Sequence, residues 1–370
     1  MKITRIQAFT YPAAYRKGDY SMSGGRVSAY QPSLVVRIDT DDDITGWGET
    51  CPHGRTYLPS FFEGELAAVQ VLAAELIGHD PVNLAAVNRT MDATLLGSNP
   101  AKAVLDYACW DILGQSVGLP ASELLGGRLQ DTLPLFTALP VADAAEQARF
   151  ARAELASGVR VFQVKVGDDP FEDAARVRTV VEAVGDGCTV LVDANGGWSL
   201  SSALVASARM ADLPVRLEQP CRTLDECARL ATRTQLPLVL DEAVVTVADL
   251  VAGRERVGNT GINLKPSRVG GLTRARTIRD LAVSLGLTMN VDDTWGGSLT
   301  SAAIAALAGG VAPESLTAVT NFETITQPSL GPGVAHVSDG RSPVPTGPGL
   351  GIEVDQAVLG AALFDTASQR

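Results

Sequence analysis

Short runs of β-branched and other apolar residues recur at a regular interval through the last two thirds of this 370-residue chain. The segments between them have the apolar spacing of amphipathic helices. Strands that alternate with helices predict parallel strands joined by right-handed crossovers. The runs are 22 to 28 residues apart and begin near Leu133, Val161, Cys188, Val215, Pro237, Gly261, Thr288 and Leu316.

Helix starts in this region support the alternation. Asp143 with Glu146, and Thr223 with Glu226, have the spacing of a capping box. Eight strands at this interval fit a closed barrel most simply. An open doubly wound sheet is the alternative, but no glycine-rich dinucleotide turn follows the first strand. We therefore predict an α/β fold, a (β/α)₈ barrel of modified TIM type, over residues 126–345.

The first 125 residues have a different order of elements. Strands are expected near 2–10, 33–39 and 44–49, and helices near 63–77, 84–97 and 100–117. Strands followed by helices predict a separate α+β capping domain over residues 1–125, with Trp47 and Trp110 in its core. The tail, residues 346–370, begins with a Gly-Pro-Gly turn, and we expect it to pack back on this domain.

Composition removes several classes of function. A net charge of -12 argues against nucleic-acid partners, because nothing would offset phosphate repulsion. The five cysteines show no C-x-x-C spacing, and the three histidines form no metal-type cluster. The N-terminus has no signal-peptide pattern, and no apolar stretch approaches the roughly 20 residues that span a bilayer. We therefore expect a cytoplasmic protein without a membrane partner.

Three carboxylates stand at the ends of consecutive predicted strands, where barrel enzymes place their active sites. They are Asp193, Glu218 and Asp241. A single acid at such a place often caps a helix, but three in register would repel each other without a cation. All-oxygen ligation with room for water suits Mg²⁺ best. The pattern therefore predicts one Mg²⁺ on these three side chains.

Two lysines end the second and sixth predicted strands, which lie opposite each other in a ring of eight. Lys165 and Lys265 would then face a bound molecule from both sides. Burial and a nearby cation are expected to lower the pKa of each ammonium toward the range of a general base. A divalent cation with a lysine base stabilises the charge that develops when a carboxylate loses its α-proton. The prediction is an enzyme that abstracts this proton.

The chain resembles the enolase superfamily, muconate lactonizing enzyme subgroup, over essentially its whole length. The matching motifs are FQVKVG around Lys165, VDANGGW around Asp193, LEQPC around Glu218, LDE at Asp241 and NLKPSRVGGLTRARTIRD around and after Lys265. The resemblance implies Mg²⁺ on the three acids, acid/base roles for the two lysines, and closure of cap loops 16–28 and 50–60 over the substrate. One departure is Gln163, which stands where the subgroup has the first lysine of K-x-K.

Within the subgroup, the motifs look most like enzymes that act on proline derivatives. The SGGR stretch at 23–26 and TNFETIT at 320–326 are closest to enzymes that dehydrate cis-3-hydroxy-L-proline. Epimerisation of proline betaine or 4-hydroxyproline betaine is the alternative. A quaternary ammonium would need several aromatic faces. The candidates for substrate contact are Tyr57, Gln163, Asn195, Asp292, Asp293, Trp295 and Phe322. Tyr20 is a further aromatic candidate, and Glu242 is expected to support the site from behind.

Two alternative functions, of other kinds, remain open. Lys265 could form a Schiff base, as in barrel aldolases, but the three acids would then lack a purpose. A barrel that only binds a small molecule would tolerate the loss of both lysines. We expect an amino acid substrate as the partner, and self-association into a homo-oligomer.

Overall fold

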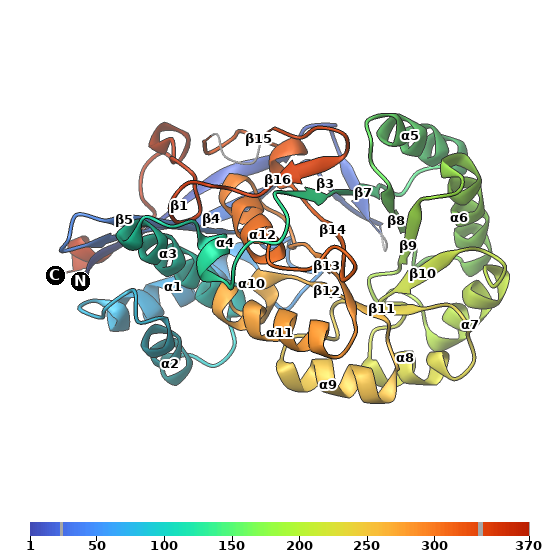
Figure 1. Ribbon diagram of the computed structural model, residues 1–370, viewed down its shortest axis with the longest axis horizontal. Coiled ribbons are helices and arrows are strands. Elements are labelled where there is room, and N and C mark those ends of the chain that lie inside the picture. The colour runs from blue at the N-terminus through green and yellow to red at the C-terminus, as the bar shows by residue number, and fades with distance from the viewer. Residues whose placement is uncertain (23–24, 332–335, 370) are drawn as a thin grey trace.

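The computed structural model describes residues 1–22, 25–331 and 336–369. Ser23 and Gly24, from the SGGR stretch of the first cap loop, lie outside the described residues. Figure 1 shows an antiparallel sheet with α1, α2 and α3 at one end of the molecule, and a ring of helices from α5 to α9 at the other. Both chain termini lie beside the antiparallel sheet.

The predicted barrel is confirmed. Eight parallel strands pair in sequence order from β7 to β14, and a parallel bridge between Leu135 and Val319 joins the last strand to the first. The strands are β7 (Phe136–Leu139), β8 (Val161–Lys165), β9 (Thr189–Asp193), β10 (Val215–Glu218), β11 (Leu238–Leu240), β12 (Gly261–Leu264), β13 (Thr288–Val291) and β14 (Leu316–Val319). The connecting helices are α5 (Ala144–Ala156), α6 (Pro170–Val184), α7 (Leu200–Arg209), α8 (Leu224–Ala231), α9 (Val247–Arg256), α10 (Pro266–Val269), α11 (Leu272–Ser284) and α12 (Ser298–Ala308).

The barrel departs from the expected repeat at its two ends. The apolar run near Leu133 forms a short separate strand, β6 (Thr132–Pro134), which pairs with β16 (Arg341–Pro343) outside the barrel. After β14 the described chain forms only a 3₁₀ turn, η2 (Phe322–Thr324), and then β15 (Thr326–Gln327), which joins β1. A full eighth helix does not form here, because the chain crosses to the antiparallel sheet.

The cap consists of an antiparallel sheet with helices on one face. Its strands are β1 (Ile3–Tyr15), β4 (Tyr30–Thr40) and β5 (Thr45–Thr50), its hairpin is β2 (Tyr20–Met22) with β3 (Arg26–Ser28), and its helices are α1 (Phe62–Leu76), α2 (Leu84–Thr94), α3 (Asn99–Val117) and α4 (Ala121–Leu124). Alternate residues of β1 and β4, such as Ile6 and Leu34, are fully buried against α1 and α3. Trp47 and Trp110 are buried as expected.

The tail returns to the cap sheet. Leu350 N–H donates to Asp111 Oδ1 on α3 at 2.8 Å. After the turns η3 (Gln356–Val358), the strand β17 (Phe364–Asp365) pairs with β1, before η4 (Thr366–Gln369). The exact boundaries of the cap and barrel domains remain predictions.

A buried carboxylate joins the cap sheet to the barrel. Glu49 on β5 accepts from the Tyr11 hydroxyl at 2.5 Å and from Thr300 N–H of α12 at 3.0 Å. The apposition is close, because a Cβ on Gly297 would lie 2.0 Å from the Tyr11 hydroxyl oxygen. These contacts hold the cap over the end of the barrel where strands β8 to β13 finish.

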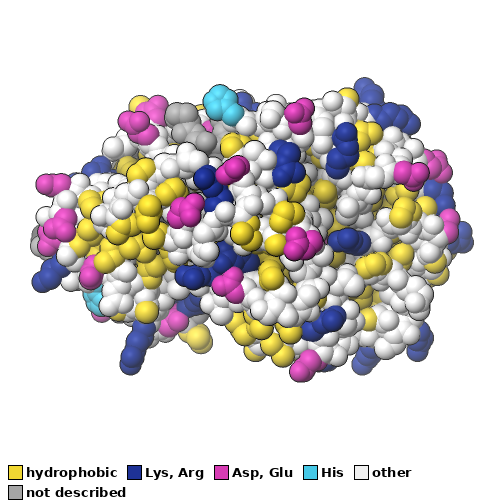
Figure 2. Space-filling model, viewed as in Figure 1, with side chains coloured by type: hydrophobic (Ala, Val, Ile, Leu, Met, Phe, Trp, Pro, Cys, Tyr) yellow, Lys and Arg dark blue, Asp and Glu magenta, His cyan; other side chains and the backbone are white. Residues whose placement is uncertain are grey.

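The distribution of charged side chains on the surface agrees with the expectation that the protein does not bind nucleic acid. Figure 2 shows lysine and arginine interspersed with aspartate and glutamate, without a basic stripe on the face in view. No helix among the described residues is long and apolar enough to cross a membrane.

Candidate active site

The polar residues of the barrel mouth follow from the two-residue period of the strands. Side chains two apart on a strand point to the same side, so Gln163 accompanies Lys165, and Asn263 accompanies Lys265 just beyond β12. A layer of apolar side chains lies deeper in the barrel and includes Phe136, Val161, Leu191 and Val239. The mouth is therefore a polar layer on a packed core.

The three predicted acids come together at this mouth. Asp193, Glu218 and Asp241 are fully buried, and Asp193 and Glu218 are register partners on β9 and β10. Lys165 Nζ lies 2.5 Å from Asp193 Oδ2. On the opposite side, Lys265 Nζ lies 2.7 Å from Asp241 Oδ2. Each lysine is thus paired with a different acid.

Within the described ranges, Glu218, the central acid, accepts hydrogen bonds only from neutral donors. Gln163 Nε2 donates to its Oε2 at 2.9 Å, and Asn263 Nδ2 donates to its Oε1 at 2.7 Å. Among the described residues Glu218 forms no ion pair. Burial and the charges of the two neighbouring acids raise the pKa of Glu218 well above its usual range. A buried carboxylate without a cation is unfavourable, so an added positive charge beside Glu218 would stabilise it.

The pKa of Asp241 shifts in the opposite direction to that of Glu218. Burial disfavours its charge, but the guanidinium of Arg268 and the ammonium of Lys265 outweigh this effect, so its pKa falls to about 2. Arg268 Nη1 lies 2.5 Å from Asp241 Oδ1, and its Nη2 donates to the Asn263 carbonyl at 2.7 Å. Gln219 Oε1 accepts from the Asp241 N–H at 2.9 Å and so orients the loop that carries this acid.

With the protein's own charges alone, the pKa values of both lysines rise, although a fall was expected beside a cation. Burial lowers the pKa of Lys165, but the neighbouring charges, Asp193 first among them, together raise it by more. The pKa of Lys265 is raised well above its usual value in the same way, because Asp241 and the other neighbouring charges together outweigh burial. The prediction counted burial and a metal ion but not the carboxylates that the ammonium groups contact.

The acids fit a hard divalent cation by their chemistry. They supply only carboxylate oxygen and converge from adjacent strands, and Glu218 has no cationic partner in the part of the chain that the structure describes. In the described part of the chain, however, no three His, Cys, Asp or Glu side chains are arranged to hold a metal ion. Two of the three acids are instead paired with the ammonium groups of Lys165 and Lys265.

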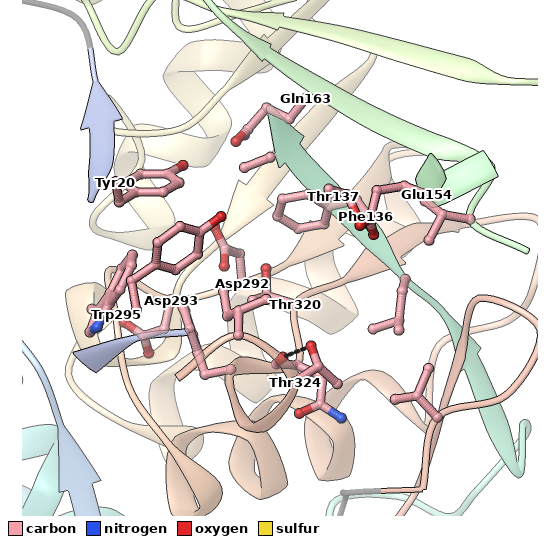
Figure 3. A pocket seen from close by; sticks show the side chains of 18 of the residues that line it. Tyr20, Phe136, Thr137, Glu154, Gln163, Asp292, Asp293, Trp295, Thr320 and Thr324 are labelled. Atoms are coloured by element: carbon pink, nitrogen blue, oxygen red, sulfur yellow. Dashed lines mark hydrogen bonds between the residues drawn. The ribbon is translucent and has the colours of Figure 1, made fainter. Parts of the chain in front are cut away.

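A cavity of about 350 Å³ lies between the cap and the mouth (Figure 3). This volume suits a small-molecule ligand. Figure 3 shows Tyr20, Asp292, Asp293 and Trp295 on one side and Gln163 on another. The predicted substrate-contact residues that line the cavity are Tyr57, Gln163, Asp292, Asp293, Trp295 and Phe322.

The two aspartates after β13, Asp292 and Asp293, have different neighbours. Asp293 accepts from the Ser267 N–H at 3.1 Å, from the Ser267 hydroxyl and from Thr294 N–H at 2.7 Å. Asp292 Oδ2 lies 4.0 Å from Lys265 Nζ. Burial raises the pKa of both acids, that of Asp293 to about 6. Asp292 lines the cavity beside Lys265.

Aromatic rings form one wall of the cavity. The rings of Tyr20 and Trp295 are 5.3 Å apart, and those of Trp295 and Phe322 are 6.1 Å apart. His53 lies 5.3 Å from Trp295 and packs as another ring of this wall. Burial lowers the pKa of His53 to about 4, so the imidazole is neutral near pH 7. This wall is apolar on its faces and carries no positive charge of its own.

Asn195 and Glu242 lie beside this cavity rather than in its lining. Asn195 Nδ2 donates to Glu242 Oε1 at 3.1 Å, and Asn195 has a φ of 47°, in the left-handed region. Such backbone strain is common at functional sites. Burial and the charge of Asp241 raise the pKa of Glu242 to about 7. Glu242 accepts hydrogen bonds from both Asn195 and Tyr57.

The sequence prediction missed four residues of this site. Asn263 and Gln219 could have been found, because one lies two positions before Lys265 and the other follows Glu218 directly. Arg268 lies on the short helix α10, and His53 comes from the cap. No local pattern marks the last two, because their places depend on tertiary packing.

Comparison with known proteins gives a consistent result. Residues 5–126 match the mandelate racemase / muconate lactonizing enzyme N-terminal domain, and residues 144–358 match the enolase C-terminal domain-like family. A cis-3-hydroxy-L-proline dehydratase from Roseibium aggregatum is 39% identical over 97% of this chain and 98% of its own length. An N-succinyl-L-Arg/Lys racemase from Bacillus cereus is 30% identical over 97% of each chain.

Solved structures agree with these relatives. A mandelate racemase/muconate lactonizing enzyme from Roseovarius nubinhibens superposes with a TM-score of 0.94 at 36% identity, over 98% of both chains. A second protein from that organism, described as complexed with magnesium, gives a TM-score of 0.93 at 33% identity, over 99% of this chain and 100% of that one.

Proposed function

The chain belongs to the mandelate racemase/muconate lactonizing enzyme family of the enolase superfamily, and from this premise we propose that it abstracts the proton α to a carboxylate. The observation that carries the proposal is the pair of buried lysines. Lys165 ends β8 and Lys265 follows β12, and these strands lie four apart in the ring of eight. A ligand in the mouth would have an amine on each face.

In this proposal Asp193, Glu218 and Asp241 hold one Mg²⁺. When bound there, the ion would supply positive charge for a substrate carboxylate whose α-carbon becomes anionic. Gln163 and Asn263 keep the Glu218 carboxylate turned toward the mouth. A lysine released from its acid also loses the interaction that raises its pKa, and it can then accept a proton.

The substrate we propose is cis-3-hydroxy-L-proline, and the reaction is loss of water. The hydroxyl and carboxylate share one ring face, so the α-hydrogen and the hydroxyl are anti. One lysine takes the α-proton, a C2–C3 double bond forms, and the opposite lysine protonates the departing hydroxyl. The enamine product tautomerises to a cyclic imine. The 39% identity to a dehydratase of this substrate supports the choice.

Epimerisation of proline betaine is the second candidate, because the same lysines could remove and return a proton on opposite faces. The aromatic wall of Tyr20, Trp295 and Phe322 favours a cationic ligand. Asp292 favours a secondary ammonium, which can donate hydrogen bonds, over a quaternary one, which cannot.

We also propose that the protein is located in the cytoplasm and that it forms a homo-oligomer.

Product trapping tests this function. Purified protein with Mg²⁺ is incubated with cis-3-hydroxy-L-proline and then treated with borodeuteride, which reduces a cyclic imine to deuterated proline. The proposal predicts that deuterated proline forms with the parent and at least about 10²-fold more slowly with Lys165→Ala or Lys265→Ala. Recovery of unchanged substrate would contradict dehydration, and a reduced adduct on Lys265 would favour Schiff-base chemistry instead.

A further inference from the structure

One tyrosine of the cap reaches a lysine of the barrel. Tyr57 belongs to the cap loop between β5 and α1, yet Lys265 Nζ donates to its hydroxyl at 3.3 Å. The same hydroxyl donates to Glu242 Oε1 at 2.8 Å and accepts from Asn195 Nδ2 at 3.2 Å. A phenol has one donor and two acceptor positions, so all three are used. Tyr57 is therefore held in one orientation by the barrel.

A residue of the other cap loop, residues 16–28, also contacts Tyr57. The guanidinium carbon of Arg26, on β3, lies 5.5 Å from the centroid of the Tyr57 ring. Arg26 Nη1 also donates to the Thr56 carbonyl at 3.4 Å. The two cap loops are thus joined to each other at the residue that meets Lys265.

Lys165, on the opposite face, forms no hydrogen bond with the described residues of the cap. Among the described residues, the only hydrogen-bond acceptor of Lys165 Nζ is Asp193. Lys265 has Asp241 as its ion-pair partner and, in addition, the Tyr57 hydroxyl from the cap. The cap therefore contacts the two lysines unequally.

We propose that Tyr57 is a positioning residue that orients the Lys265 ammonium, and that Arg26 couples this orientation to the contact between the two cap loops. The phenol supplies Lys265 with a fixed partner besides Asp241, so the nitrogen keeps its place when its bond to Asp241 is given up. Removal of the hydroxyl frees Lys265 but leaves Lys165 as it is. The assignment rests on the proposed function only for the role of Lys265 in the reaction.

The chain is suited to a direct test, because it contains only five lysines, at positions 2, 17, 102, 165 and 265. Parent and Tyr57→Phe are acetylated briefly with acetic anhydride, and the modification of each lysine is measured by peptide mass spectrometry. We expect the ratio of Lys265 to Lys165 acetylation to rise about threefold in the variant, since one hydrogen bond is lost. Tyr30→Phe, an exposed tyrosine of the cap, should leave the ratio unchanged.

An unchanged ratio in Tyr57→Phe would overturn the assignment, as would an equal rise at both lysines, which would mean that the cap merely loosens. The dehydration of cis-3-hydroxy-L-proline gives a second readout. Its kcat should fall about tenfold in Tyr57→Phe, with KM within about twofold. If the parent does not dehydrate this substrate but the acetylation ratio still rises, the positioning role stands and the proposed function fails.

Discussion

The most informative single change is Gln163→Leu, because it removes one donor from a buried carboxylate and keeps the volume of the side chain. Gln163 Nε2 lies 2.9 Å from Glu218 Oε2, and neither residue is more than 2% exposed. Without the amide, this oxygen keeps no donor among the described residues. Leaving a buried acceptor without its donor costs about 1–3 kcal/mol, so the free energy of unfolding should fall by about 2 kcal/mol.

Urea unfolding in the presence of a chelator measures this loss without a contribution from bound metal. Gln356→Leu, at an exposed position, is the matched control and should change the free energy of unfolding by less than about 0.5 kcal/mol. A similarly small change for Gln163→Leu would refute the view that this amide supports Glu218. The companion change Gln163→Lys restores the charge usual in the subgroup, and should weaken Mg²⁺ binding at least about tenfold by calorimetry, because an ammonium beside Glu218 competes with the ion.

Three other predictions concern the same site. Lys165→Ala and Lys265→Ala should each lower the rate of α-proton exchange about 10²–10⁴-fold while circular dichroism stays unchanged, since each removes a general base or acid. Arg268→Met should lower the free energy of unfolding in urea by about 3 kcal/mol, because Asp241 loses a buried partner at 2.5 Å and retains only Lys265. His53→Phe should reduce acid sensitivity. The pKa of His53 is about 4 when folded, so between pH 6.5 and 4 the unfolded chain binds a proton that the folded chain does not. The parent should therefore lose about 3 kcal/mol more than the variant over this range, and equal losses would contradict the assignment.

The barrel could be predicted because its strands are buried on both faces. Such strands are nearly continuous apolar runs, and the runs near Val161, Gly261 and Thr288 begin at the first residue of the observed strands. The run near Leu133 misled the prediction because an apolar run does not reveal which partner it pairs with. Leu133 pairs with the segment around Ser342, more than 200 residues away, and this pairing is a property of the tertiary fold.

The site could be predicted where a residue follows a strand directly. Lys165, Asp193 and Glu218 each end a strand, and their convergence follows from barrel geometry. Arg268 and the protonation of the lysines could not be predicted in this way. Both depend on which charges lie within hydrogen-bonding distance after folding, and electrostatic effects at such distances outweigh the effect of burial that composition suggests.

The central claim is that this mouth removes a proton α to a carboxylate with the help of Mg²⁺. Proton NMR of the purified protein in D₂O, with cis-3-hydroxy-L-proline and, separately, proline betaine, tests it most directly. With Mg²⁺ present, we predict that the α-hydrogen signal of the hydroxyproline disappears as cyclic imine signals grow, and that a chelator stops the change. If only the betaine exchanged its α-hydrogen, the claim of proton abstraction would stand, but the substrate would be the betaine instead of the hydroxyproline. Intact α-hydrogen signals in both compounds, at saturating Mg²⁺, would contradict it.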